Sequence, residues 1–90
     1  MIERLIWPLH NVAKLKGHGI RPEEVVDLAH LDECTVDVRP EYPDQVRITG
    51  ATRAGRLLTV ALHDLGGGVY RPITGWDATE DELRQYRGER

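Results

Sequence analysis

Arginine side chains concentrate around one predicted strand–turn–strand unit. Alternating apolar and polar residues predict strands over Gln45–Ala51 and Arg56–His63, because successive side chains of a strand point to opposite faces. Arg47, Arg53 and Arg56 lie on these strands or on the turn between them. A small sheet that carries several cations near one loop can hold an anionic group. The unit therefore predicts a phosphate-binding surface.

Further basic residues lie outside this unit. Lys14, Lys16 and His18 come at the end of a predicted helix, which the glycines on either side of His18 terminate. Arg71 lies on the predicted last strand, Val69–Thr74. A histidine in this place can simply hydrogen-bond the helix end, and lysines there interact favourably with the helix dipole. These residues are candidates for a site and, equally, for a solvated helix end.

The arginines also have a structural interpretation. Arg56 can pair with an acid such as Asp44, and Arg71 can pair with Asp77 or Glu82. Both tryptophans of the chain are expected in the core or at an interface, since a small domain needs large apolar side chains.

The elements that would position these residues form a single α+β domain over residues 1–90. Pro22 fits the first turn of a helix, and Thr79 with Glu82 matches a capping box at the start of another. Pro72 cannot donate a ladder hydrogen bond, so the last strand is predicted to be an edge strand or to be bulged there. The expected order is two helices, an antiparallel sheet of about four strands and a C-terminal helix: Pro8–Lys16, Pro22–Leu31, Cys34–Arg39, Gln45–Ala51, Arg56–His63, Val69–Thr74 and Glu80–Tyr86.

The composition is typical of one globular domain. The chain has 90 residues, of which 40% are hydrophobic and 30% are charged. No apolar run approaches the roughly 20 residues of a membrane-spanning helix, and the N-terminal segment is too short for a signal peptide. The single cysteine, Cys34, cannot form an internal disulfide. We therefore expect a cytoplasmic protein that does not contact a membrane.

Several kinds of chemistry are excluded or disfavoured. The chain contains no serine, so a serine nucleophile is excluded. One cysteine and scattered histidines predict neither a metal site nor a cofactor. A net charge of −3 and a pI of 5.7 argue against generic nucleic-acid binding. Between positions 45 and 76, however, four arginines face one acid, which can leave a cationic face on an acidic protein.

The order of these elements and several short motifs resemble the BrnT-type toxins of bacterial toxin–antitoxin pairs. The matching positions are Trp7, His18-Gly19-Ile20, Glu23-Glu24-Val25, Gly50-Ala51-Thr52, Gly55-Arg56-Leu57-Leu58, Val60, Arg71, Ile73-Thr74, Ala78-Thr79, Glu82 and Tyr86. They span nearly the whole chain. The resemblance implies a RelE-like ribonuclease fold and a protein that arrests translation by cutting RNA.

The resemblance also implies roles for particular residues. Metal-free RNA cleavage needs a base for the ribose 2′-OH, cations around the phosphate and an acid for the leaving oxygen. By their match to the family pattern, the catalytic residues would be His18, Lys16, Arg56 and Arg71. The remaining expected RNA contacts are Lys14, Arg47, Arg53 and Trp76.

One position departs from the family pattern. BrnT-type toxins usually read Ile-Ser-Ala-Arg at the end of the last strand, whereas this chain reads Ile73-Thr74-Gly75-Trp76. Trp76 therefore replaces the arginine most readily assigned to the active site. Tryptophan cannot balance phosphate charge, although its ring can stack on a base. Either another cation serves the chemistry, or the chain binds without cutting.

Three hypotheses follow. The first is a toxin component whose partners are RNA, on or off the ribosome, and a cognate antitoxin, as a homodimer or as a heterotetramer with the antitoxin. The second is a binding module of the same fold that has lost catalysis and acts through a protein partner. The third is a small homodimer with the Pro72 strand or Trp76 at the interface.

Overall fold

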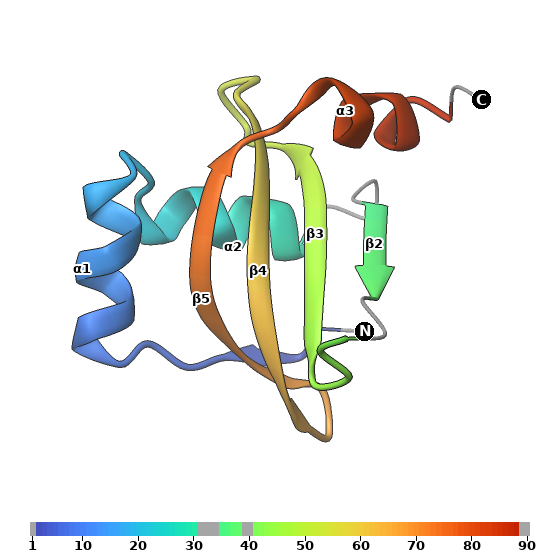
Figure 1. Ribbon diagram of the computed structural model, residues 1–90. Helices are drawn as coiled ribbons and strands as arrows, with labels where there is room; N and C mark the ends of the chain where they lie inside the picture. Colours follow the sequence, from blue (N-terminus) through green and yellow to red (C-terminus); the bar gives the residue numbers. More distant parts are fainter. Residues whose placement is uncertain (1, 31–34, 39–40, 89–90) are drawn as a thin grey trace.

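The described residues form an α+β domain (Figure 1). The computed structural model describes residues 2–30, 35–38 and 41–88. The elements in chain order are β1 Arg4–Leu5, α1 Leu9–Gly17, α2 Pro22–His30, β2 Thr35–Val38, β3 Gln45–Ala51, β4 Leu57–Gly66, β5 Val69–Asp77 and α3 Glu80–Tyr86.

The sheet has five strands in the order β1-β5-β4-β3-β2. β1 pairs in parallel with β5, and the other neighbours are antiparallel. The prediction of about four antiparallel strands is therefore corrected by one short parallel strand, whose two residues are too few to show a period. β5 also runs past the predicted Thr74 to Asp77, which brings Trp76 into the sheet. The predicted end residues Leu31, Cys34 and Arg39 lie outside the described residues.

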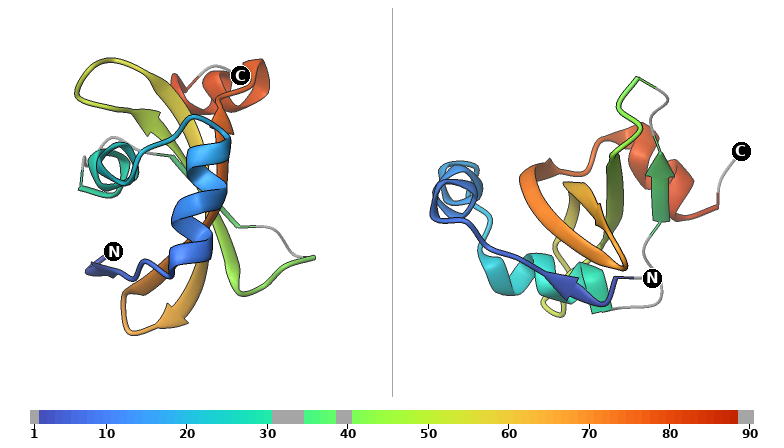
Figure 2. Two further views of the ribbon diagram at one scale, coloured as in Figure 1. Left: turned by 90° about the vertical axis from the view of Figure 1, so that its left-hand side faces the viewer. Right: turned by 90° about the horizontal axis from the view of Figure 1, so that it is seen from below.

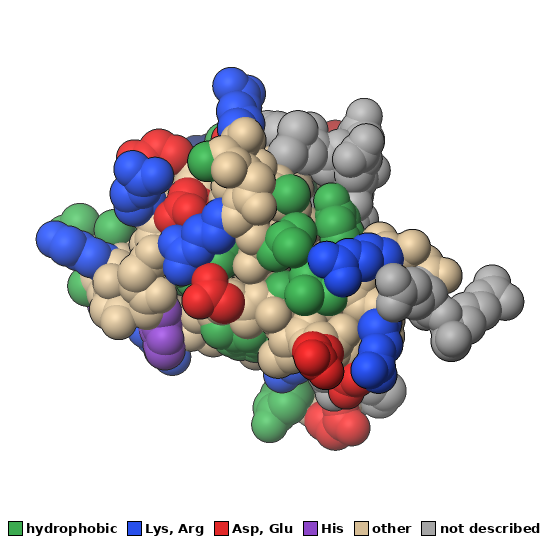
Figure 3. Space-filling view, turned by 90° about the horizontal axis from the view of Figure 1, so that it is seen from above, with side chains coloured by type: hydrophobic (Ala, Val, Ile, Leu, Met, Phe, Trp, Pro, Cys, Tyr) green, Lys and Arg blue, Asp and Glu red, His purple; other side chains and the backbone are tan. Residues whose placement is uncertain are grey.

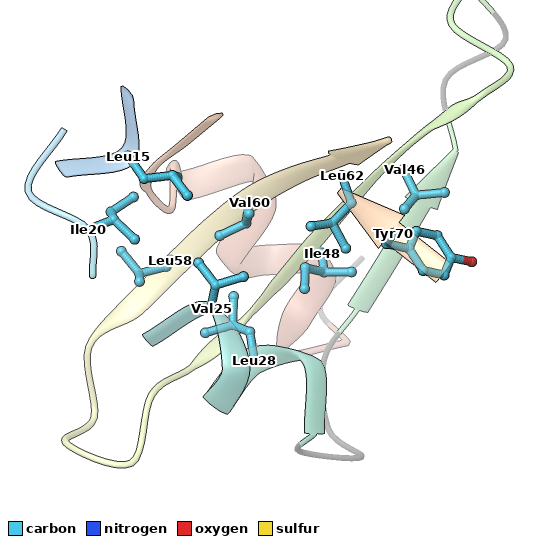
Figure 4. Close-up of a cluster of buried hydrophobic side chains, with 10 residues drawn as sticks. All are labelled: Leu15, Ile20, Val25, Leu28, Val46, Ile48, Leu58, Val60, Leu62 and Tyr70. Carbon is cyan, nitrogen blue, oxygen red and sulfur yellow. The ribbon is translucent and has the colours of Figure 1, made fainter. Parts of the chain in front are cut away.

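Helices pack on both sides of the sheet, two on one side and one on the other (Figure 2). α1 and α2 lie on one side, and α3 lies on the opposite side near the end of β5 (Figures 1 and 2). The core sits between the sheet and the two N-terminal helices (Figure 4). It consists of Leu15, Ile20, Val25, Leu28, Val46, Ile48, Leu58, Val60, Leu62 and Tyr70.

α1 ends at the predicted glycines. The N–H of Ile20 donates to the carbonyl of Leu15, and the N–H of Gly19 donates to that of Lys16. With Gly19 at φ 74°, this is a Schellman ending that only glycine adopts without strain. The buried residues of α1 are Asn11 and Leu15. Leu9, at the start of the helix, is 86% exposed.

The side-chain alternation predicted for the central strands is confirmed. Val46 and Ile48 of β3 and Leu58, Val60 and Leu62 of β4 all face the helices and are buried. The residues between them must face the other side.

Pro72 lies beside an irregularity in the pairing of β4 with β5, between Ala61 and Leu62, which confirms the predicted bulge. Among the described residues, β1 pairs only with Val69 and Tyr70 of β5, so Pro72 also lies on a part of β5 whose outer side has no strand partner.

Candidate functional site

The side of the sheet opposite α1 and α2 carries a set of polar side chains that we call the open face. Strand register aligns its members in three rows across β3, β4 and β5. The rows are Gln45–His63–Arg71, Arg47–Ala61–Thr74 and Thr49–Thr59–Trp76. Among the described elements, only α3 packs on this side, above the third row (Figure 2).

In the first row, Arg71 contacts His63 across the β4–β5 pair. Arg71 Nη2 lies 2.9 Å from His63 Nδ1. A guanidinium has only donors, so Nδ1 accepts, and the proton of the neutral ring is on Nε2. His63 therefore presents an N–H donor to the surface, beside the positive charge of Arg71. Both groups suit an anion.

In the second and third rows, a guanidinium stacks on an indole. Arg47 Cζ lies 5.2 Å from the centroid of the Trp76 ring, within the range of a cation–π contact. The ring is fixed in turn, because Trp76 Nε1 donates to Glu82 Oε1 at 3.0 Å. An Arg–Trp layer of this kind is a platform on which a nucleic-acid base can stack.

Glu82 ties α3 to the open face. Its Oε1 accepts from Thr59 Oγ1 at 2.9 Å and from the Thr79 N–H at 2.9 Å, in addition to Trp76. Thr59 also shares a hydrogen bond with Thr49, with 2.8 Å between the hydroxyl oxygens. Partial burial acts to raise the pKa of Glu82, but the hydrogen bonds outweigh it and hold the pKa below its ordinary value. The carboxylate is thus ionised at neutral pH.

The two arginines of the open face retain unused donors. Arg47 Nε and Arg71 Nε are buried and have no hydrogen-bond partner within the part of the chain that the structure describes. A buried donor without an acceptor costs on the order of 1–3 kcal/mol. Two such donors lie on one face, on neighbouring rows, and neither meets an acceptor among the described residues.

Arg56 lies elsewhere, at a cluster of Gly19, Glu24, Arg56 and Asp77 that we call the Arg56 junction. Its Nη1 donates to the Gly19 carbonyl at 2.7 Å and to Glu24 Oε1 at 3.2 Å. Its Nε and Nη2 donate to Asp77 Oδ1 at 3.2 and 3.1 Å. Burial acts to lower the pKa of Arg56, but the bonds to Asp77 and Glu24 raise it above its ordinary value. The predicted structural pairing of Arg56 is therefore right in kind, although Asp44 is the wrong partner.

The remaining predicted cations lie at the same end as the Arg56 junction or on α1. Lys14, Lys16 and His18 are exposed on α1 and at its C-terminal cap. The side chain of Arg53 is 83% exposed and pairs with Asp27 of α2, with 3.4 Å between Nε and Oδ1. Basic and acidic side chains are interleaved on this end of the molecule rather than separated into a cationic patch (Figure 3).

The four residues expected to act together in catalysis do not converge. His18, Lys16 and Arg56 lie near the α1–α2 turn, whereas Arg71 is on the open face near the β4–β5 hairpin. Six residues of β5 separate Arg71 from Asp77 of the Arg56 junction, or roughly 20 Å at about 3.3 Å per residue. Of the eight predicted site residues, the structure brings together Arg47, Arg71 and Trp76. The predicted pairing of Arg71 with Asp77 or Glu82 was wrong.

Sequence reasoning missed two members of this face. His63 showed no identifiable partner, because its pairing with Arg71 depends on two irregularities in the β4–β5 register. Glu82 was expected in the capping box, which is present, and as a candidate partner of Arg71, but not as the acceptor for Trp76 and Thr59.

Two clefts adjoin the open face. One, of about 400 Å³, lies between α3 and the sheet and is lined by Asp37, Arg47, Trp76, Thr79, Asp81, Glu82 and Gln85. The other, of about 290 Å³, lies beside His63 and is lined by Glu41, Tyr42, Pro43, Asp44, Gln45, His63 and Ile73.

No three His, Cys, Asp or Glu side chains of the described ranges come together as metal ligands. None of the described helices is both long and apolar enough to pass through a membrane.

These features define an α+β protein of the BrnT-like toxin fold, in which two N-terminal helices back a curved sheet and a capped C-terminal helix crosses its other side. The structure is similar to the crystal structure of the ribonuclease toxin BrnT of Brucella abortus, with a TM-score of 0.65. The match covers 86% of this chain and 97% of that chain at 14% sequence identity. No protein-family model matches the sequence, and no curated protein does so either.

Proposed function

We propose that this protein is a toxin component of a toxin–antitoxin pair and that its open face binds single-stranded RNA. The observation that carries the proposal is the pair of buried, unused guanidinium donors, Arg47 Nε and Arg71 Nε, on one face of a fold that a ribonuclease toxin shares. Phosphate oxygens are acceptors of the required charge and geometry. His63 and Trp76 add an N–H donor and a stacking surface beside them.

The same geometry favours binding over rapid cutting. In metal-independent cleavage, a base takes the proton of the ribose 2′-OH, the 2′-oxygen attacks the adjacent phosphate, and the bond to the 5′-oxygen breaks as that oxygen takes up a proton. Cations stabilise the charge that develops on the phosphate. Arg47 and Arg71 supply such cations. His63 is a poor base in this arrangement, because Nδ1 already accepts from Arg71 and Nε2 carries the proton. We therefore propose that RNA binding is strong and that cleavage is slow.

A comparison of two arginine variants tests the binding proposal. Fluorescence anisotropy would measure the affinity of the purified protein for a short labelled single-stranded RNA. We expect the double substitution Arg47→Ala/Arg71→Ala to weaken binding about a hundredfold or more, since each charge-assisted contact contributes about 1.5–3 kcal/mol. Arg53→Ala removes an exposed cation that pairs with Asp27 and should leave the affinity nearly unchanged. Equal losses in the two variants would contradict the proposal.

Cleavage is tested separately. RNA incubated with the protein and EDTA should be cut slowly, with 2′,3′-cyclic phosphate ends, because no metal takes part in the step. If RNA binds tightly and no cleavage is detected, the protein is an RNA-binding component without nuclease activity.

The second candidate is a binding module that acts through a protein partner. It is favoured by Trp76, which stands where the resemblance places a catalytic arginine, and by the acids Asp37, Asp81 and Glu82 in the cleft beneath α3. A protein that neither binds nor cuts RNA, does not arrest growth when expressed alone and still co-purifies with the product of a neighbouring gene would fit this candidate.

A further inference from the structure

The cleft between α3 and the open face combines an aromatic layer, a cation and carboxylates. Its volume of about 400 Å³ lies within the range of small-ligand sites, about 300–1,000 Å³. Arg47 and Trp76 belong both to the cleft and to the open face, so a chain that lies along the open face passes the mouth of the cleft.

The stacking layer of the cleft is held in place before any ligand arrives. Trp76 Nε1 donates to both oxygens of Glu82, at 3.0 and 3.3 Å, which fixes the indole. Arg47 lies over the ring at 5.2 Å. A planar heterocycle can add to such a layer with little loss of side-chain entropy, because the side chains are already ordered.

The carboxylates of the cleft differ in their remaining acceptor capacity. Oε1 of Glu82 already accepts from Thr59, Trp76 and the Thr79 N–H. Asp81 accepts from Arg84 Nη1 at a long 3.3 Å, and its side chain is 92% exposed. Asp81 therefore offers a carboxylate that can turn toward a ligand in the cleft.

Guanine matches this combination better than the other bases. Its N1–H and N2–H₂ groups are adjacent donors that fit the two oxygens of one carboxylate. Uracil places carbonyls on both sides of its single N–H and is repelled by a carboxylate. Adenine offers one amino group beside an acceptor. Donor pattern alone thus ranks guanine first.

We propose that this cleft is a guanine-binding subsite, in which the base stacks on the Arg47–Trp76 layer and its N1–H and N2–H₂ edge binds Asp81. The subsite rests on the proposed function, because an RNA strand on the open face delivers the base. The acids of the cleft also suit an arginine of a protein partner. However, Arg47 already stacks on Trp76, and its positive charge would repel a second guanidinium at that position.

The test compares RNAs that differ at one base. Short oligouridines with a single central guanine, inosine, adenine or uridine are measured by anisotropy. We expect the guanine RNA to bind about tenfold tighter than oligouridine, and inosine, which lacks the N2 amino group, to lose most of this gain. Equal affinities for all four RNAs would overturn the subsite while the RNA-binding function stands.

A matched pair of substitutions on α3 locates the acceptor. Asp81→Asn should abolish the preference for guanine, measured as the ratio of the affinities for the guanine RNA and for oligouridine. Glu80→Gln removes the same charge from the same helical turn but does not line the cleft, and it should keep the preference. Circular dichroism verifies that both variants retain the fold. Preference retained in Asp81→Asn, or lost equally in both variants, would overturn the assignment of Asp81.

A second readout does not depend on the RNA strand. Guanosine alone should shift the NMR signal of the Trp76 indole N–H, and adenosine or free arginine should shift it much less. If guanosine has this effect while no RNA binds, the subsite stands and the proposed function fails. If arginine shifts the indole more than guanosine does, the cleft is a protein-binding site and the subsite is overturned.

Discussion

The Arg56 junction and the open face both contain arginines, but the hydrogen-bond donors of these arginines are used to different extents. At the Arg56 junction, every nitrogen of the guanidinium donates to a carbonyl or a carboxylate of the chain itself. On the open face, Arg47 and Arg71 each keep a buried Nε that meets no acceptor in residues 2–30, 35–38 and 41–88. The first arrangement links parts of the fold to one another, and the second is the one that we propose to bind RNA.

The difference shows that charge along the sequence does not by itself locate an anion site. Arg53 and Arg56 surround the turn that first predicts a phosphate surface, yet both pair with acids of α2, Asp27 and Glu24. Arg47 and Arg71 lie farther apart in sequence and share a face only because β4 lies between them.

The largest expected effect comes from restoring an arginine to the open face. If Trp76 occupies the place of a transition-state donor, Trp76→Arg should raise the rate of RNA cleavage about a hundredfold. Single-turnover cleavage of a labelled RNA measures this rate. The same substitution should remove guanine preference, because the indole is lost. An unchanged cleavage rate would argue that position 76 has no part in catalysis.

Removal of the guanidinium from the Arg56 junction should act on stability instead. Arg56→Ala leaves the buried Glu24 with only the longer ion pair to Arg21, at 3.8 Å, and we expect unfolding by urea to show a loss of about 2–3 kcal/mol. This figure is below that of a fully buried pair, since the Arg56 side chain is 34% exposed. Arg53→Ala, at an exposed pair, should cost less than about 1 kcal/mol. Comparable losses in both variants would remove the distinction between the two sites.

The salt dependence of RNA affinity distinguishes the open face from α1, with a smaller expected effect. Each arginine that binds a phosphate contributes about −0.7 to the slope of log affinity against log salt for single strands. Arg71→Ala should therefore make the slope shallower by about 0.7, and Lys16→Ala should leave it unchanged. A shallower slope in Lys16→Ala and an unchanged slope in Arg71→Ala would show that phosphate binds at α1 and not at the open face.

The smallest effect concerns pH. Because the pKa of Glu82 is lowered in the folded protein, its contribution to holding α3 is fully present above the ordinary value of about 4.5. It is lost as the pH falls through the lowered, folded-state pKa. The Trp76 indole N–H signal should thus be constant from neutral pH to about 4.5 and shift below it. A shift centred above pH 4.5 would show that the hydrogen bonds do not favour the carboxylate.

Much of the fold was predictable because it depends on local patterns. The alternation in β3 and β4 and the capping box of Thr79 with Glu82 each follow from residues close in sequence. The order of elements carried the resemblance to BrnT-type toxins, which the fold confirms at 14% identity.

The site was less predictable because its contacts are long-range. Arg56 reaches Gly19 and Glu24 across 37 and 32 residues. The β4–β5 hairpin turns at Gly67 and Gly68, both with positive φ, but the register shift between Asp64 and Gly66 changes which residue faces Arg71. The parallel pairing of β1 with β5 has no local signal, since Arg4 and Leu5 form it alone.

The most direct test of the account observes the arginine Nε–H groups by ¹⁵N NMR during titration with single-stranded RNA. The account predicts that the Nε–H signals of Arg47 and Arg71 shift as RNA is added, while those of Arg53 and Arg56 stay in place. Shifts confined to Arg56 and to the backbone around Lys16 and His18, or no shift of any arginine at saturating RNA, would contradict it.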